Sequence, residues 1–331
     1  MNKDVDLWRS VRDQLEHDQP VVLLVVADSS GSSPGRAGYK MVVTSKGELY
    51  GSIGGGVMEV ALVDQSRNTM SLLPKVVGGA FCRVVEQVHQ KNAPNASGMI
   101  CSGRQTVILR QLTTDDATTV KTIIRCIESK GNAFLTLTSE SFSVGQTEGG
   151  TQNTHFEKRS ETDFIYTERL GSRNELVIVG GGHCALALSE IAAKLGFRIR
   201  IFDDRPELNT LDKNEFADEI TIVDSYETIG DHIPRGTDVY VVVMTLGYAS
   251  DAVVVRQVID HEIKYFGVLG SKAKMATLMK ELREEGIDVA NLERIRTPIG
   301  LPINSRTPEE IAVSIAAEII AVKNGSELSR S

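Results

Sequence analysis

Residues 175–206, ELVIVGGGHCALALSEIAAKLGFRIRIFDDRP, decide the fold of the second half of this chain. An apolar run leads directly into three glycines, a helical apolar pattern follows, and a second apolar run ends at Asp203. The glycines have the spacing Gly180-x-Gly182-x-x-Ala185, which is typical of the turn that begins a dinucleotide-binding βαβ unit. The stretch therefore predicts a Rossmann-like domain.

Each position of this turn has a physical role in a nucleotide site. Gly180 makes the tight turn, Gly182 lets backbone approach a phosphate, and the following helix N-terminus, with His183, faces the anion. Asp203 lies about 20 residues further on, where a carboxylate can accept from a ribose hydroxyl and favour NAD, while Arg205 keeps NADP open. The alternative is a turn kept for geometry alone, with no nucleotide bound.

Length and composition narrow the class of protein. A chain of 331 residues predicts two domains, here 1–170 and 171–331, and 41% hydrophobic with 24% charged residues is ordinary for a globular protein. The net charge of −8 gives no basic field for nucleic acid. The longest apolar run, 21–27, is too short for a membrane span, and the charged amphipathic N-terminus is not typical of a signal peptide. We expect a cytoplasmic protein.

The two halves have different patterns. After residue 175, short β-branched apolar runs alternate with helical segments, which predicts a doubly wound parallel sheet. The first half predicts a mixed α/β domain, with a hairpin turn at 45–47 and helices at 56–68 and 118–130. The polar residues 140–163 are expected to form a surface hairpin or loop.

Two small-residue loops, 29–38 and 51–56, lie on either side of the predicted hairpin. Small residues let backbone N–H groups approach an oxyanion, hydroxyls add donors, and an arginine can bind phosphate through two hydrogen bonds. The alternative is tight packing of the loops. The candidate ligand residues are Ser32, Ser33, Arg36, Ser52, Gly54, Gly55 and Gly56.

Two cysteines and one strand end are further candidates. Cys101 lies among glycines near an arginine, which can lower the pKa of a thiol, although a buried packing role is the alternative. Cys184 follows the glycine turn, where packing is the favoured role. Ser271 and Lys272 follow the last predicted strand, at the edge where ligands bind in open α/β folds. Ser271 is also a natural helix cap.

Taken together, these pieces resemble the XdhC/CoxI family, the accessory proteins of molybdenum hydroxylases such as xanthine dehydrogenase. The resemblance spans nearly the whole chain. It rests on the motifs GSSP at 31–34, GSIGGG at 51–56, MICSG at 99–103, VGGGH at 179–183, DDRP at 203–206, GVLGSK at 267–272, PIGL at 298–301 and TPEEIA at 307–312.

The resemblance implies a molybdenum cofactor chaperone that carries the cofactor, protects it during sulfuration and delivers it to an apo-molybdenum hydroxylase. It implies a cysteine desulfurase as a second partner. Under this interpretation Cys101 is a candidate molybdenum ligand, since a soft thiolate suits the metal. A homodimer is the default expectation for the oligomeric state.

The chain departs from the family pattern at two places that bear on its chemistry. Cys101-Ser102-Gly103 stands where relatives have Cys-Gly-Gly, and Thr245-Leu246-Gly247-Tyr248 stands where relatives carry Thr-x-x-His. The chain has Tyr248 in place of that histidine, so the resemblance implies no role for it here.

Two alternatives assign an enzymatic activity to the chain. The first is an NAD(P)-dependent oxidoreductase that uses the Rossmann half, although no clear catalytic acid–base pair is apparent. The second is xanthine dehydrogenase itself, against which the four scattered cysteines argue, since two iron–sulfur clusters need about eight thiolates.

Overall fold

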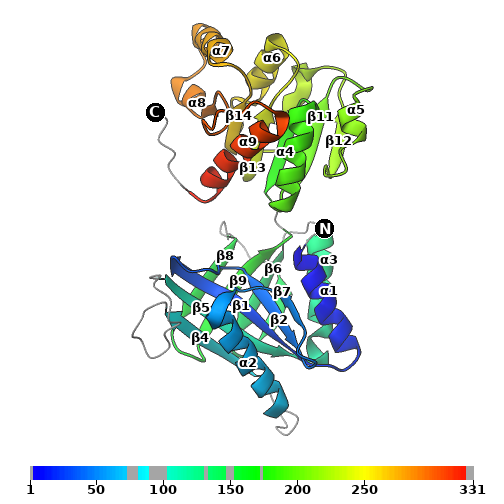
Figure 1. Cartoon of the computed structure of the whole chain (residues 1–331), viewed down its shortest axis with the longest axis vertical. Helices are drawn as coiled ribbons and strands as arrows, with labels where there is room; N and C mark the ends of the chain where they lie inside the picture. The colour runs from blue at the N-terminus through cyan, green and yellow to red at the C-terminus, as the bar shows by residue number, and fades with distance from the viewer. Residues whose placement is uncertain are drawn as a thin grey trace. The chain divides into compact units, whose positions relative to one another are not determined.

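The chain divides into two compact units, Met1–Ser172 and Arg173–Ser331 (Figure 1). Each hydrophobic cluster formed by the described residues lies wholly within one unit. The structure is a computed structural model, and it describes residues 3–72, 81–88, 103–129, 133–146, 153–171 and 174–325.

The larger sheet of the first unit is antiparallel, with five strands in the order β3-β2-β1-β5-β4. The predicted turn at 45–47 is confirmed, because β2 and β3 pair on either side of it. The strands are β1 (Val21–Gly31), β2 (Lys40–Thr44), β3 (Leu49–Gly51), β4 (Cys82–Val88) and β5 (Gly103–Leu112).

Alternate residues of β1 face two different cores, as expected for a strand covered on both faces. Val22 and Leu24 pack with helix α2 on one face. Val21 and Leu23 belong to a second cluster, with helices α1 and α3. The helices of this unit are α1 (Lys3–Glu16), α2 (Gly56–Leu72) and α3 (Ala117–Glu128), and a short 3₁₀ turn, η2 (Thr114–Asp116), precedes α3.

A second antiparallel sheet completes this unit, with four strands in the order β7-β6-β9-β8. The prediction of a hairpin or loop at 140–163 is wrong, because this stretch holds two strands that do not pair with each other. β7 borders β6 and β8 borders β9, so both are edge strands whose polar outward side chains hide the strand pattern. The strands are β6 (Ala133–Thr138), β7 (Phe142–Gly145), β8 (Thr154–Lys158) and β9 (Phe164–Leu170).

The second unit has a parallel sheet of six strands in the order β12-β11-β10-β13-β14-β15. This is the strand order of the Rossmann fold, so the predicted fold class is confirmed. Four residues of β10 are buried, because helices cover both faces of the sheet. The strands are β10 (Glu175–Val179), β11 (Arg198–Asp203), β12 (Glu219–Ile222), β13 (Gly236–Val243), β14 (Ile263–Val268) and β15 (Ile295–Arg296).

Helices α4 and α9 pack on one face of this sheet, and α6, α7 and α8 pack on the other (Figure 1). The 3₁₀ segment η3 packs on the same face as α6. The strand order reverses between β10 and β13, so the carboxyl ends of these two strands form the topological switch point, where open α/β folds bind ligands. The helical segments are α4 (His183–Lys194), α5 (Asn209–Asp212), η3 (Tyr226–Asp231), α6 (Tyr248–Val258), α7 (Lys272–Glu284), α8 (Val289–Glu293) and α9 (Pro308–Lys323).

Candidate functional site

The glycine turn follows β10 at the switch point, and Gly180 is fixed there by a close backbone approach. It adopts φ +108°, a conformation that L side chains rarely take. A Cβ at this position would overlap the carbonyl oxygen of Met244 and lie 2.8 Å from the Thr245 nitrogen. The first glycine of the fingerprint therefore serves the contact between the turns after β10 and β13.

Gly182 has a different environment, which leaves room for a ligand. It is the N-cap residue of α4, with φ −71° and ψ −168°, and it provides no side-chain cap. A Cβ built on Gly182 would meet no atom within 4 Å. The first N–H groups of a helix have no intrahelical partner and lie at the positive end of its dipole. The start of α4 is thus suited to an oxyanion.

The neighbouring positions fit the predicted roles in part. Ala185 is fully buried against the sheet, as the third fingerprint position requires. His183 is exposed at the first position of α4. Burial, and then the Glu309 carboxylate, raise the pKa of the Cys184 thiol above its ordinary value. The thiol packs against the core, as favoured from the sequence.

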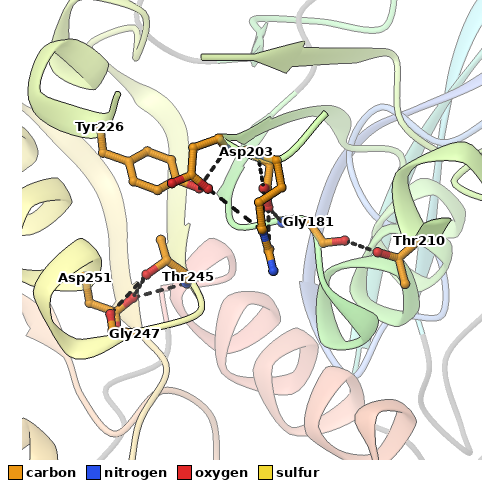
Figure 2. Close-up of polar contacts among 9 residues, drawn as sticks. Gly181, Asp203, Thr210, Tyr226, Thr245, Gly247 and Asp251 are labelled. Carbon is orange, nitrogen blue, oxygen red and sulfur yellow. Dashed lines mark hydrogen bonds and ion pairs between the residues drawn. The ribbon is translucent and has the colours of Figure 1, made fainter. Parts of the chain in front are cut away.

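Asp203 ends β11, the position predicted for the ribose-binding acid, and its side chain is fully buried. Its carboxylate accepts a hydrogen bond from the Gly181 N–H at 2.6 Å (Figure 2). The Arg205 guanidinium donates to it at 2.8 and 2.7 Å. Burial alone would raise the pKa of Asp203, but the hydrogen bonds from Arg205 and Gly181 outweigh it and hold that pKa below its ordinary value.

A second buried acid holds the turn after β13. Asp251 accepts from the Thr245 hydroxyl at 2.6 Å and from the Thr245 N–H at 3.1 Å (Figure 2). Its other oxygen accepts from Lys274 of α7 at 3.0 Å. Asp251 therefore ties the turn at the switch point to the starts of α6 and α7. In the sequence, Asp251 is only weakly indicated and no pattern marks Lys274.

The predicted pair Ser271 and Lys272 lies at the end of β14, with both side chains exposed. The Ser271 hydroxyl accepts from the Lys274 N–H at 3.3 Å, so it caps α7. Because α7 already has this side-chain cap, its N-terminus is less open to an anion than that of α4.

In the first unit, the donors of the loop at 51–56 converge on one side chain of α2. The Glu59 Oε2 atom accepts from the Ser52 hydroxyl at 2.7 Å, the Ile53 N–H at 2.9 Å and the Gly55 N–H at 3.0 Å. Gly54 donates to the Ser52 hydroxyl at 3.1 Å. An anion supplied by the chain itself thus organises the predicted oxyanion loop.

The two small-residue loops pack closely on each other. A Cβ at Gly54 would lie 2.7 Å from the Pro34 carbonyl carbon. Ser33 is buried and donates to Gln105 at 2.9 Å, and Gln105 donates to the Ile53 carbonyl at 2.9 Å. Gly56, which begins α2, is exposed and adopts φ +76°.

Two of the predicted polar side chains in the first loop face outward. Ser32 and Arg36 are exposed, and Arg36 donates to the Gly31 carbonyl at 3.3 Å. Arg36 therefore stays close to its own loop in this conformation, with its guanidinium at the surface.

Cys101, the predicted molybdenum ligand, lies outside the described residues. In the part of the chain that the structure describes, no three His, Cys, Asp or Glu side chains gather in a way that could hold a metal ion. Within the same ranges, every helix falls short of the length and apolar character that a bilayer-spanning segment needs.

The second unit is thus a Rossmann-type domain with an open helix N-terminus at its switch point. Residues 176–319 match the XdhC Rossmann domain, and residues 14–73 match the XdhC and CoxI family. Together the two matches cover more than half of the chain. The chain belongs to the XdhC and CoxI family.

Two curated proteins are similar over most of this chain. The uncharacterized protein YqeB of Escherichia coli (strain K12) is 25% identical over 314 residues, which are 94% of this chain and 45% of that protein. The chain therefore spans less than half the length of this relative. A probable xanthine dehydrogenase subunit of Bacillus subtilis (strain 168) is 24% identical over 332 aligned positions, with coverage of 93% of this chain and 95% of that protein.

One solved structure is similar over the whole chain. A crystal structure from Bacillus halodurans, described as a xanthine dehydrogenase, has a TM-score of 0.72 and 22% identity, covering 100% of this chain and 98% of that one. At this identity the likeness establishes the fold.

Proposed function

We propose that this chain is an accessory protein of a molybdenum hydroxylase of the xanthine dehydrogenase type. In this role it carries molybdenum cofactor, protects it during sulfuration and delivers it to the apo-enzyme. Family membership supports the role, as does the name of the Bacillus subtilis relative, a probable xanthine dehydrogenase subunit. The chain has four cysteines, too few for the iron–sulfur clusters of the hydroxylase itself.

The observation that carries the proposal is the open N-terminus of α4 at the switch point. Molybdenum cofactor is a pterin dithiolene with a phosphate group, and the unpaired N–H groups beside Gly182 suit that phosphate. The dithiolene and the metal supply the cofactor's own redox chemistry once it reaches the hydroxylase. This chain binds and shields its cargo and performs no turnover.

The role requires two macromolecular partners. The cargo's final destination is an apo-molybdenum hydroxylase, and a cysteine desulfurase supplies the sulfur while the cofactor is held. A homodimer remains our expectation for the oligomeric state.

A charge placed at the N-cap tests the site without disturbing the fold. Gly182→Asp puts a carboxylate into open space at a backbone conformation that suits an N-cap aspartate, so the free energy of unfolding should stay equal or rise by a few tenths of a kcal/mol. The same carboxylate repels the phosphate of the cargo. Gly182→Ala, which adds a Cβ without a charge, separates the effect of bulk on binding from the effect of charge.

The measurement is anaerobic titration with molybdenum cofactor, followed by gel filtration and assay of retained molybdenum and pterin. We expect stoichiometric retention by the natural chain and weaker affinity for Gly182→Ala, because its Cβ stands where the backbone approaches the phosphate. Gly182→Asp should bind most weakly, with an affinity at least about tenfold below that of the natural chain. No retention by the natural chain would refute the proposed function. Equal retention by Gly182→Asp would remove the α4 N-terminus from the site.

Two further variants test the residues proposed from the sequence. Cys101→Ala should weaken molybdenum retention more than pterin retention if the thiolate contacts the metal. Arg36→Ala should weaken retention without loss of stability, because Arg36 is exposed. Unchanged affinity in either variant would remove that residue from the site.

A further inference from the structure

The acid at the end of the second strand selects the nucleotide in dinucleotide-binding Rossmann domains, where it accepts hydrogen bonds from the ribose hydroxyls. Asp203 holds this position, at the carboxyl end of β11 and beside the glycine turn. The state of its carboxylate therefore decides whether a ribose can be bound here.

The Asp203 carboxylate is saturated by donors of its own chain. Oδ2 accepts from the Gly181 N–H at 2.6 Å and from Arg205 Nη2 at 2.7 Å. Oδ1 accepts from the Arg205 N–H at 2.9 Å and from Arg205 Nε at 2.8 Å. A carboxylate has about four acceptor sites, so these four donors leave none for a ribose diol. The side chain is also fully buried, and a ribose cannot reach it.

The surroundings are no better suited to the 2′-phosphate of NADP. In NADP sites an arginine near this position receives the phosphate. Here the Arg205 guanidinium is paired with Asp203 and lies 3.8 Å from Asp204 Oδ1. One cation between two carboxylates has a net negative charge, which repels a phosphate. Asp204 is held in place by Tyr226, whose hydroxyl donates to it at 3.2 Å.

We propose that Arg205 is a specificity-determining residue that closes the ribose subsite of this domain, so that the site rejects NAD and NADP. The ligand of the α4 N-terminus is then a short phosphomonoester whose phosphate needs no neighbouring ribose contact. This second part rests on the proposed function, whereas the closure of the ribose subsite does not.

Removal of the guanidinium should open the subsite. In Arg205→Ala, Asp203 keeps the two backbone donors, Gly181 N–H and the N–H of residue 205, and regains two free acceptor sites. Arg205→Gln keeps a shorter polar side chain without the charge, in case the alanine variant folds poorly. The matched control is Asp203→Ala combined with Arg205→Ala, which also removes the acid that would bind the ribose.

Calorimetric titration with NAD⁺ and NADP⁺ tests the proposal, with circular dichroism to establish folding. We expect no saturable binding of either nucleotide to the natural chain, and at least about tenfold tighter NAD⁺ binding by the single Arg205 variants than by the double variant. NAD⁺ or NADP⁺ binding to the natural chain in the micromolar range would overturn the proposal. Folded Arg205 variants that gain no NAD⁺ affinity would overturn it as well.

Molybdenum cofactor retention by the same proteins separates this proposal from the proposed function. Retention of the cofactor by the natural chain and by Arg205→Gln supports both the proposed function and the closed ribose subsite. If the natural chain retains no cofactor while the NAD⁺ pattern holds, the proposed function fails and the closure of the ribose subsite stands.

Discussion

Gly180 and Met244 touch across the switch point of the second unit, because a Cβ at Gly180 would overlap the Met244 carbonyl oxygen. The turn after β10 and the turn after β13 are therefore in backbone contact. The glycine that opens the fingerprint is required by this contact and by its φ of +108°, whether or not a ligand is bound.

Gly180→Ala should accordingly destabilise the protein. Strain at a positive φ combines with the steric overlap, so we expect a loss of about 3 kcal/mol in the free energy of unfolding, measured by urea denaturation. Gly182→Ala, with negative φ and open space, should change it by less than about 1 kcal/mol. Equal losses in the two variants would contradict the distinct roles of these glycines.

The pH dependence of stability should reveal the Asp203 carboxylate. Its folded-state pKa is below the ordinary value, so the stability it provides is present above about pH 4, the unfolded-state pKa, and is lost as the pH falls through the folded-state pKa. Asp203→Asn should be less stable than the natural chain by about 3 kcal/mol at neutral pH. Urea denaturation over a pH series should show this difference narrowing below about pH 4. If the difference in free energy of unfolding between the two proteins stayed constant over the pH series, Asp203 would not be ionised in the folded state.

Glu59 should determine the order of the loop at 51–56. Glu59→Ala removes the acceptor of three hydrogen bonds, so we expect a loss of about 2 kcal/mol in stability and faster hydrogen exchange at the Ile53 and Gly55 amides. Asp64→Ala, further along α2 at an exposed pair with Arg67, should change neither quantity appreciably. Unchanged exchange in Glu59→Ala would show that the loop is held by packing alone.

Lys40 and Glu168 form a buried ion pair between the two sheets of the first unit, with Nζ to Oε1 at 2.5 Å. The Lys40 ammonium also donates to the Gly38 carbonyl at the end of the first small-residue loop. Lys40→Met leaves the largely buried Glu168 carboxylate without its cation and with the Tyr166 hydroxyl as a neutral donor, so we expect a loss of about 3 kcal/mol in the free energy of unfolding. Adding Glu168→Gln to the Lys40→Met variant should restore part of the lost free energy of unfolding.

An exposed pair provides the control for this variant. The Lys121 Nζ atom lies 2.9 Å from Glu16 Oε1, and both side chains are about half exposed. Lys121→Met should change the free energy of unfolding by less than about 1 kcal/mol. A comparable loss in both variants would mean that burial does not set the strength of the Lys40–Glu168 pair.

Local patterns in the sequence were enough to predict the second unit. Glycine spacing and β-branched apolar runs depend on neighbouring residues, and they predicted the parallel sheet and the start of α4. The cap of α9, in which the Thr307 side chain accepts from the Glu310 N–H, is equally local. In contrast, β7 and β8 escaped prediction, because these edge strands are four and five residues long and hold too few apolar residues to set a pattern.

The sequence by itself determined where an oxyanion can meet backbone N–H groups, since runs of small residues and the patterns that begin helices are local features of the sequence. Only the tertiary structure decided which of these donors remain open. Glu59 accepts from N–H groups of the loop at 51–56, Ser271 accepts from an N–H at the start of α7, and Asp203 accepts from the Gly181 N–H of the glycine turn. The physical reason is that hydrogen-bond saturation depends on side-chain direction and burial in the folded chain. Helices α4 and α6 begin at Gly182 and Gly247, which provide no side-chain cap, so the first N–H groups of both helices lack one.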